Sequence, residues 1–424
     1  MRLDGQKGHM RILFIHQNFP GQFKHLAPAL AARGHQVHAL TMRDIGTSLW
    51  QGVAILRYQP ERGSSPEIHP WLVDLETKLI RAEACSKAAY AMKDQGYAPD
   101  LIIAHPGWGE SLFLKQVWPH AKLMVYSEFY YRAQGSDVNF DPEFSLEDRT
   151  LDARMMIKNI NNDLNLTQAD LAISPTHWQA DSHPPQFRHK ISVIHDGIDT
   201  QKIVPNAAVS MSIRSSVRDE MIHLNAQSEV VTFVNRNLEP YRGYHVFMRA
   251  LPALLKARPQ ARVLIVGGDE TGYGAKPPEG QRWRDIFFNE IRPQLDQQAL
   301  SRIHFLGKLP YDDFIALLQL SSVHVYLTYP FVLSWSLLEA MSAGCSIVAS
   351  DTAPLREVLR QDDNGVLVDF FDSAALAANV AALLADPARR QHMGQAARKF
   401  AQAHYDLRTV CLPRQIALIE SIQC

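Results

Sequence analysis

The chain contains a series of short, continuous apolar runs, each followed by a turn and a segment with helical spacing. The first run is Arg11–His16; a turn, a predicted helix over Gln22–Arg33 and a second predicted strand over Gln36–Thr41 follow it. An apolar run without polar alternation is typical of a strand that is covered on both faces, as in a parallel sheet. This order of strand, helix and strand predicts a right-handed βαβ unit.

The same order recurs in two series. Further strands are predicted at 100–105, 122–127, 170–174, 191–195, 230–234, 262–266, 302–305, 323–327 and 346–350, and a mostly helical tail at 374–404. Alternating strands and helices are typical of doubly wound α/β domains. We therefore expect the α/β fold class, with two Rossmann-like domains over residues 10–199 and 200–404 that face a cleft, joined by a linker near 196–228.

Composition excludes several classes of protein. Of the 424 residues, 43 are Lys or Arg and 44 are Asp or Glu, so the net charge of −1 argues against a nucleic-acid partner. An apolar run of about 18 residues, which a membrane span needs, is missing. The polar start predicts no signal peptide and makes Met10 the expected functional start. The four cysteines, which lack zinc or disulfide spacing and indicate a reducing cytosol, are Cys85, Cys345, Cys411 and Cys424.

Two first-half turns are candidate ligand sites. Gly21 follows the opening strand, where a glycine lets a ligand approach the backbone and the next helix N-terminus favours an anion. A single glycine is not the G-x-G-x-x-G fingerprint, which weakens a nicotinamide oxidoreductase hypothesis and leaves a plain βα turn as the alternative. His105 ends a later strand, where it can face a ligand or bond to the backbone.

The second half offers cations and a helix start. Arg236 and Arg242 flank a turn directly after a strand, and guanidinium groups suit the oxygens of a diphosphate, although such pairs also occur on solvated loops. Ser336 is predicted to cap a helix whose N-terminus can hold a phosphate. Glu339, one turn further on, can accept hydrogen bonds from ribose hydroxyls or favour its own helix dipole.

Together these segments resemble the retaining GT-B glycosyltransferases of family four, the glycosyl transferases group 1. The resemblance covers most of the chain from Met10 and is strongest over 230–368. The segments that carry it are FVNRNLEPYRGYHVF, ARVLIVGG, RIHFLGKLPYDDF, SWSLLEAMSAGCSIVASD, LREVL, DDNGVLVD, ADLAIS and ISVIHDGIDT. It implies transfer of a sugar from a nucleoside-diphosphate sugar, UDP- or GDP-linked, to a hydroxyl acceptor with retention at the anomeric carbon.

The resemblance implies roles residue by residue. Arg236 and Arg242 would bind the donor diphosphate and His105 would lie near the transferred sugar, which makes these three the catalytic set. The implied donor-binding set is Gly21, Leu306, Leu309, Leu333, Ser334, Trp335, Ser336, Leu337 and Glu339. The tail 405–424 would return to the first domain, which takes the acceptor side. No metal and no separate cofactor are expected, because fixed cations could replace a metal and no D-x-D motif stands at a fitting strand end.

Position alone makes Glu128 and Tyr130, after a first-half strand, candidates for acceptor contact. The resemblance implies a glycan or lipid-linked acceptor, as in polysaccharide biosynthesis, and a cytoplasmic protein for which contact with a membrane surface stays open. Two departures matter. Phe331 stands where the family has the first glutamate of E-x7-E, and Ala353-Pro354 stands where relatives often have glycines. A silent sugar-nucleotide binding protein and a nucleotide-sugar epimerase are therefore the alternatives.

Overall fold

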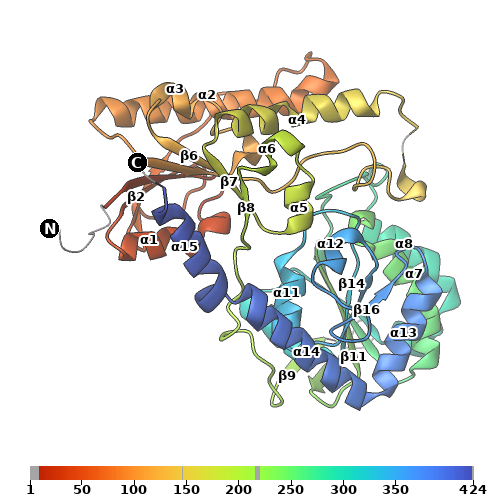
Figure 1. Ribbon diagram of the computed structural model, residues 1–424. Helices are drawn as coiled ribbons and strands as arrows, with labels where there is room; N and C mark the ends of the chain where they lie inside the picture. Colours follow the sequence, from red (N-terminus) through yellow and green to blue (C-terminus); the bar gives the residue numbers. More distant parts are fainter. Residues whose placement is uncertain (1–8, 146, 215–219, 423–424) are drawn as a thin grey trace. The chain divides into compact units, whose positions relative to one another are not determined.

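The computed structural model describes residues 9–145, 147–214 and 220–422, and these divide into two compact units (Figure 1). Unit 1 holds the chain up to Ala133, Glu147–Asp196 and the tail from Arg408. Unit 2 holds Gln134–Leu146 and Gly197–Leu407. Each unit contains a parallel sheet with helices, which confirms the α/β fold class. Cys424 lies outside the described residues.

Unit 1 is built on an eight-stranded sheet of order β3-β4-β2-β1-β5-β6-β7-β8, parallel except at the edge pair β3–β4. Its strands are β1 (Arg11–Ile15), β2 (Gln36–Thr41), β3 (Leu49–Trp50), β4 (Val53–Arg57), β5 (Leu101–Ala104), β6 (Lys122–Tyr126), β7 (Leu171–Ser174) and β8 (Ile191–Val193). Its helices are α1 (Leu26–Ala32), α2 (Val73–Asp94), α3 (Leu114–Val117), α4 (Leu151–Gln168), α5 (His177–Asp181), α6 (Pro185–Arg188) and α15 (Leu412–Glu420). Strands β3 and β4 were not predicted from the sequence.

The opening strand β1 shows why both faces of this sheet are apolar. Ile12 and Phe14 belong to the core cluster under α1 and α15, whereas Leu13 and Ile15 belong to the cluster under α2 and α3. Helices α2 and α4 lie side by side over unit 1 (Figure 1). A strand with alternate residues buried on opposite faces reads as a continuous apolar run, as the sequence does here.

The first helix is shorter than predicted. A 3-10 turn, η1 (Gly21–Phe23), precedes α1, which begins at Leu26 rather than at Gln22. Pro28 explains the difference. Proline has no backbone N–H. In a helix beginning at Gln22, Pro28 would lie in the interior and one helical hydrogen bond would be missing. In α1 it lies in the first turn, where a backbone N–H has no partner within the helix in any case.

Unit 2 is built on a six-stranded parallel sheet of order β13-β12-β11-β14-β15-β16. Its strands are β11 (Val230–Asn237), β12 (Arg262–Gly268), β13 (Ile303–Gly307), β14 (Val323–Tyr326), β15 (Ile347–Ser350) and β16 (Val366–Val368). Its helices are α7 (Tyr244–Ala257), α8 (Trp283–Ile291), α9 (Gln297–Leu300), α10 (Tyr311–Leu320), α11 (Trp335–Ser342), α12 (Ala353–Arg356), α13 (Ser373–Ala385) and α14 (Pro387–Tyr405).

Two segments differ from the expected domain layout. The expected linker contains an antiparallel pair, β9 (Ser210–Arg214) and β10 (Met221–Asn225), and its buried Ile213 and Leu224 pack on a core cluster of unit 2. Residues 134–146 fall within the predicted first domain but belong to unit 2. Their aromatic side chains explain this, because the ring of Phe140 packs against Tyr329, Phe370 and Phe371.

Each sheet has one point where the chain changes its direction of winding. In unit 1 this switch point lies between β1 and β5, and in unit 2 it lies between β11 and β14. Ligands of open α/β sheets bind outside the carboxyl ends of the strands at such points. Among the described residues, the helices are all too short or too polar to cross a bilayer. The thiols of Cys85, Cys345 and Cys411 are buried and unbridged.

Candidate functional site

In unit 2, the predicted arginine pair lies at the switch point. Arg236 is exposed near the end of β11, and Arg242 ends the short 3-10 helix η5 (Pro240–Arg242) with 8% of its surface exposed. Arg242 Nη1 donates to Thr328 Oγ1 at 2.7 Å and to the Val332 carbonyl at 3.3 Å, so it bridges the loops that follow β11 and β14. Within the described part of the chain, neither guanidinium forms an ion pair with a carboxylate.

Phe331, the departure from the family pattern, packs beside Arg242. The guanidinium carbon of Arg242 lies 5.7 Å from the Phe331 ring centroid and 5.6 Å from that of Tyr273. Phe331 is 6% exposed and meets the Tyr241 ring edge-on at 5.1 Å. Cation–π contacts of this kind stabilise a buried guanidinium without neutralising its charge. Phe331 therefore helps to position a cation.

Helix α11 follows β14, but Ser336 is not its cap as predicted. Ser334 has extended backbone angles and its hydroxyl accepts the Ser336 N–H at 3.3 Å, so the cap lies two residues earlier. Ser336 instead bonds to the Ser334 hydroxyl at 2.9 Å. Leu333 and Leu337 are buried in a core cluster, against which the half-buried Trp335 also packs. These apolar side chains anchor the start of the helix at the switch point.

Glu339 is buried on α11 and already has a partner that the sequence did not reveal. Its Oε1 accepts the Tyr311 hydroxyl at 2.7 Å, although 45% of the tyrosine is exposed. Burial and the neighbouring Glu339 carboxylate raise the pKa of Tyr311 well above its usual value, so the tyrosine stays a donor. A ribose that bonds to the Glu339 carboxylate would therefore either share it with the Tyr311 hydroxyl or displace that hydroxyl.

Leu306 and Leu309 lie on and just after the edge strand β13, two strands away from β11. Both are half-buried and pack against a core cluster that includes Val230 and Leu264. The structure thus places these two predicted donor contacts at the sheet edge, apart from the arginine pair.

In unit 1, the loop after β1 is shaped around a histidine that sequence reasoning missed. Gly21 has φ of +45°, and a Cβ at this position would lie 2.3 Å from His16 Nε2. His16 Nδ1 accepts the Asn18 N–H at 3.0 Å, and Nε2 lies 2.8 Å from Gln22 Oε1. Burial and the nearby His105 lower the pKa of His16 to about 4. Gly21 is therefore required by the imidazole behind it.

His105 and Glu128, predicted separately, come together after β5 and β6. His105 is 3% exposed, and its ring stacks on Tyr126 at 5.3 Å. Its Nε2 lies 3.7 Å from Glu128 Oε2, while Gln22 Nε2 donates to Glu128 Oε1 at 3.4 Å. Burial raises the pKa of Glu128, but the interactions with His105, His16 and Gln22 outweigh it and leave that pKa below its usual value. The signal for His16 and Gln22 was their position at the end of the first strand, beside Gly21.

Tyr130, the other predicted acceptor contact, is tied to α4. Its hydroxyl donates to Asp163 Oδ1 at 3.0 Å. Burial, together with this hydrogen bond and the charge of Asp163, raises the pKa of Tyr130 to about 12. Its phenol thus links the segment that follows β6 to α4, and a role in acceptor binding stays a prediction.

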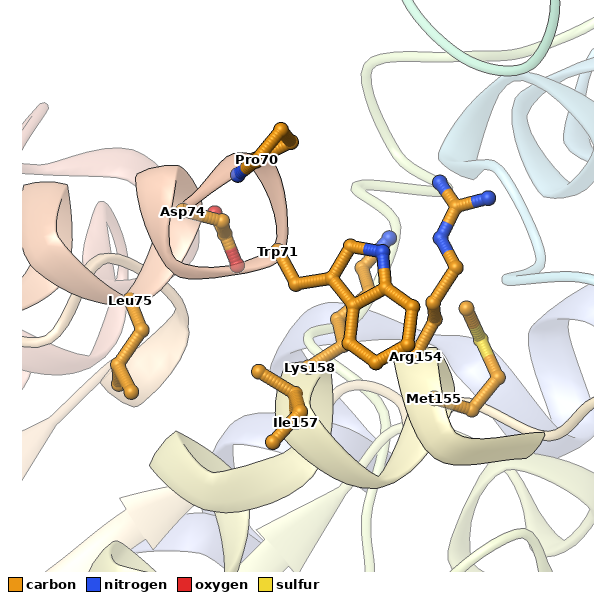
Figure 2. Close-up of a pocket in the computed structure, with 8 residues that line it drawn as sticks. All are labelled: Pro70, Trp71, Asp74, Leu75, Arg154, Met155, Ile157 and Lys158. Carbon is orange, nitrogen blue, oxygen red and sulfur yellow. The ribbon is translucent and has the colours of Figure 1, made fainter. Parts of the chain in front are cut away.

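The described residues of unit 1 line a small hollow and a larger one. The smaller, of about 50 Å³, includes both His105 and Glu128; its lining residues are Lys78, His105, Pro106, Gly107, Tyr126, Ser127, Glu128, Phe129, Tyr131, Asn161, Asn162, Leu166 and His183. The larger, of about 580 Å³, was not predicted and lies between the start of α2 and α4. Figure 2 shows its lining residues: Pro70, Trp71, Asp74, Leu75, Arg154, Met155, Ile157 and Lys158. Arg154 pairs with Asp148 and Asp74 with Lys78, so this hollow offers mainly apolar surface.

One group of described side chains has the composition of a metal site. Asp141, Glu143 and His245 each offer a ligand atom, all within 4.8 Å of one another. The group is already tied up within the protein: His245 Nε2 lies 3.0 Å from Asp141 Oδ2, which also accepts the Tyr329 hydroxyl at 2.8 Å, and Arg249 bonds both Glu143 oxygens. This group fastens residues 134–146 to unit 2.

Two doubly wound α/β units are the architecture of the GT-B class. Solved structures agree: sucrose-phosphate synthase from Thermosynechococcus elongatus has a TM-score of 0.70 at 20% identity, with 97% of this chain and 99% of that chain covered. The Anabaena protein Alr3699/HepE in complex with UDP and glucose has a TM-score of 0.64 at 18% identity, with 97% and 100% covered. These likenesses show the fold.

Family models identify the chain more narrowly. A model of the glycosyl transferase family 4 group matches residues 33–203, and a model of the glycosyl transferases group 1 matches residues 220–400. The chain therefore belongs to the family 4, group 1 glycosyl transferases.

Curated relatives agree with this assignment. D-inositol 3-phosphate glycosyltransferase of Corynebacterium efficiens is 30% identical over 56% of this chain and 51% of its own. Phosphatidyl-myo-inositol mannosyltransferase of Mycolicibacterium smegmatis is 33% identical over 42% of each. The chain spans about half the length of these curated relatives.

Proposed function

We propose that this protein is a retaining, metal-independent glycosyltransferase that moves a sugar from a nucleoside-diphosphate sugar to a hydroxyl acceptor. The observation that carries the proposal is the arginine pair at the switch point of unit 2. Arg242 is buried and fixed by Thr328 and Val332, and Arg236 is exposed near the end of the same strand, β11. Two guanidinium groups without carboxylate partners among the described residues are suited to a diphosphate.

The chemistry follows from where charge develops. As the bond from the anomeric carbon to the diphosphate oxygen breaks, the leaving group gains negative charge, which Arg236, Arg242 and the N-terminus of α11 would stabilise. The acceptor oxygen bonds to the same face of that carbon, and its proton passes to a departing phosphate oxygen. The scheme needs no protein base and no cofactor, and the arginines supply the positive charge that a metal would otherwise bring. Glu339 would bind the ribose, and His105 would lie near the transferred sugar.

Relatives favour particular ligands for these roles. Alr3699/HepE has been crystallised with UDP and with UDP-glucose, which supports a sugar-nucleotide donor and makes UDP the first nucleotide to test, with GDP beside it. The relatives in Corynebacterium and Mycolicibacterium carry inositol phosphate and phosphatidyl-myo-inositol in their names, which supports a glycan or glycolipid acceptor.

A lipid-linked acceptor would bring the protein to a membrane surface, and we propose that the larger hollow of unit 1 is the point of contact. Exposed Leu72, Val73 and Met156 adjoin its lining residues in sequence. Sedimentation with anionic vesicles tests this proposal: Trp71→Ala should reduce the bound fraction, and Trp50→Ala, on edge strand β3, is the control. Equal sedimentation of both variants would contradict it.

The function is tested by incubating the protein with UDP-glucose or GDP-mannose, with and without myo-inositol or a glycolipid, and by identifying the products. A glycoside with retained anomeric configuration supports transfer. Conversion of the donor alone to an epimer selects the epimerase. Phe331 favours the silent binding protein as the second candidate, because it removes a carboxylate from the expected donor site; binding of the nucleotide sugar without any turnover would select it.

A further inference from the structure

We propose that Asp137 and Asp141 are positioning residues for Arg242, the buried guanidinium at the switch point of unit 2. Both aspartates belong to the segment 134–146, which falls within the predicted first domain but packs in unit 2. The inference rests on the proposed function, since it concerns the arginine to which that function assigns the donor diphosphate. It depends on two tyrosine hydroxyls that connect this segment to the two loops around Arg242.

The loop that follows β14 holds the Arg242 side chain. Arg242 Nη1 donates to Thr328 Oγ1 at 2.7 Å and to the Val332 carbonyl at 3.3 Å. Thr328 Oγ1 donates its own proton to the Tyr329 carbonyl at 3.0 Å, which leaves its lone pairs for the arginine. The Tyr329 N–H donates to the Tyr241 carbonyl at 3.1 Å, so this loop is joined to the one that carries Arg242. A contact that fixes these two tyrosines therefore restricts the arginine as well.

Each of the two tyrosine hydroxyls donates to one of the two aspartates. Tyr241 donates to Asp137 Oδ2, and Tyr329 donates to Asp141 Oδ2 at 2.8 Å. Ser136 Oγ donates to Asp137 Oδ1 at 2.8 Å, which leaves Oδ2 for the tyrosine. The two tyrosines and the two aspartates are all buried. A hydrogen bond from a buried hydroxyl to a carboxylate is strong, and its loss leaves a desolvated acceptor, so these bonds determine where the rings lie.

The local sequence of the segment directs Asp141 toward its tyrosine. A proline takes the first position of the short 3-10 helix η4 (Pro142–Phe144), and Asp141 caps this helix, since its Oδ1 accepts the Glu143 N–H at 3.0 Å. Oδ2 is left to accept from Tyr329, and His245 Nε2 lies 3.0 Å from it as well. Burial raises the pKa of Asp141, but the interactions with His245, Tyr329 and the Glu143 N–H outweigh it and leave that pKa below its usual value. The acceptor is therefore an ionised carboxylate at neutral pH.

Substitutions that remove one hydroxyl and keep the ring test the two links. Tyr241→Phe and Tyr329→Phe each delete one hydrogen bond to the segment 134–146. Tyr244→Phe is the matched control, because this buried tyrosine of α7 donates to the Arg284 carbonyl at 3.1 Å.

Variants of Asp137 test an aspartate directly. Asp137→Ala removes the acceptor of the Tyr241 hydroxyl and should behave as Tyr241→Phe does. Asp137→Asn keeps an oxygen for Tyr241 and directs its N–H groups toward the Ser136 hydroxyl, so it should restore values close to those of the parent.

Glu143→Gln separates positioning from attachment of the segment. Glu143 lies on the same segment, and both of its oxygens accept from Arg249 of α7. The substitution weakens this ion pair and leaves the Tyr241 and Tyr329 hydroxyls in place.

Two measurements are made on each variant. The first needs no ligand: it is the rate at which phenylglyoxal, a dicarbonyl reagent that modifies guanidinium groups, labels Arg242, followed by mass spectrometry of the peptides. Arg302 is the reference in the same sample, since it is also buried and donates to backbone carbonyls elsewhere in unit 2. The second measurement is the affinity for UDP, GDP and inorganic pyrophosphate, by isothermal titration.

We expect phenylglyoxal to label Arg242 severalfold faster in Tyr241→Phe and in Tyr329→Phe than in the parent, with Arg302 unchanged. UDP and pyrophosphate should bind about fivefold more weakly to both variants, because the guanidinium that contacts the diphosphate is less well fixed. Tyr244→Phe and Glu143→Gln should keep the parent's values in both measurements, even where they lower the melting temperature. This difference separates positioning of the arginine from a general loss of stability.

Arg242 labelling at the parent's rate in both tyrosine variants overturns the inference, and so does faster labelling without any loss of diphosphate affinity. Equal effects in Glu143→Gln would mean that the segment only stabilises unit 2, which also contradicts it. If one tyrosine variant does not fold, the other decides. A parent that binds none of UDP, GDP and pyrophosphate overturns the proposed function instead, and the labelling rates alone then decide whether the aspartates position Arg242.

Discussion

The two switch points have the same topology and opposite chemistry. In unit 2 the loops after β11 and β14 carry two guanidinium groups and a helix start, so the local charge is positive. In unit 1 the loops after β1, β5 and β6 carry His16, whose imidazole burial keeps neutral, together with His105 and the Glu128 carboxylate. The comparison teaches that the shared fold fixes where a ligand sits, while the side chains at the strand ends decide whether it is an anion or a neutral polyol.

The largest expected effect is on the anion side. Arg242→Ala should weaken UDP binding about 100-fold or more. The substitution removes a charged, buried donor, and the diphosphate oxygens that it would contact are then desolvated without a hydrogen bond. Isothermal titration measures the affinity. Exposed Arg292→Ala, elsewhere in unit 2, is the matched control for lost charge.

The melting temperature must be followed in the same samples, since Arg242 also bonds Thr328 and Val332. A folded Arg242→Ala variant with unchanged UDP affinity would contradict the claim that the switch point of unit 2 binds an anion through Arg242.

The second effect tests whether His16, at the switch point of unit 1, is neutral in the folded protein. Because the folded protein lowers the pKa of His16 from 6.5 to about 4, the unfolded chain binds more protons between these values. The stability that the neutral imidazole contributes is therefore complete above about pH 6.5 and is lost as the pH falls toward about 4, by up to about 3 kcal/mol. His16→Gln should make the free energy of unfolding less steeply dependent on pH in this range.

Urea unfolding at pH 7, 6, 5 and 4.5 measures the slope. His183 and His324, whose pKa values are also lowered to about 4, should still contribute in the variant. A variant with the parent's slope would mean that folding does not lower the pKa of His16.

Much of this arrangement could be read from the sequence, for physical reasons. Apolar runs such as Arg11–His16 mark parallel strands because both faces are buried, and residues that follow such strands, such as Arg242 and His105, must lie at the carboxyl edge of the sheet. Partners supplied by distant residues could not be read in this way. Nothing local to Glu339 indicates that the phenol of Tyr311 bonds to it, and nothing local to Glu128 indicates Gln22.

The placement of residues 134–146 was missed for a related reason. Their polar composition resembles a surface loop, whereas their partners in unit 2 are distant in sequence: Phe140 packs on Tyr329, and Glu143 pairs with Arg249. Helix starts were misplaced by a few residues, at Ser334 and Leu26, because a cap or a proline decides among closely spaced alternatives.

A smaller effect separates the two arginines. Arg236 is exposed, so water screens its charge, and Arg236→Ala should weaken UDP binding only about tenfold. The part contributed by Arg236 should shrink as salt is raised from 50 to 500 mM, whereas that of Arg242 should persist. Titration of parent and variants at both ionic strengths tests this, and equal salt sensitivity of the two contributions would show that burial does not distinguish them.

The smallest effect concerns Glu339, the one carboxylate on α11. Glu339→Ala should lower the preference for UDP over its 2′,3′-dideoxy form by about fivefold, the value of one hydrogen bond of about 1 kcal/mol. Tyr311→Phe is the matched variant, because it removes the phenol but keeps the carboxylate, and it should retain the preference. If Glu339→Ala discriminates as the parent does, the carboxylate serves only to hold Tyr311. The anion side of the comparison would then consist of the arginines and the helix start, with the ribose recognised elsewhere.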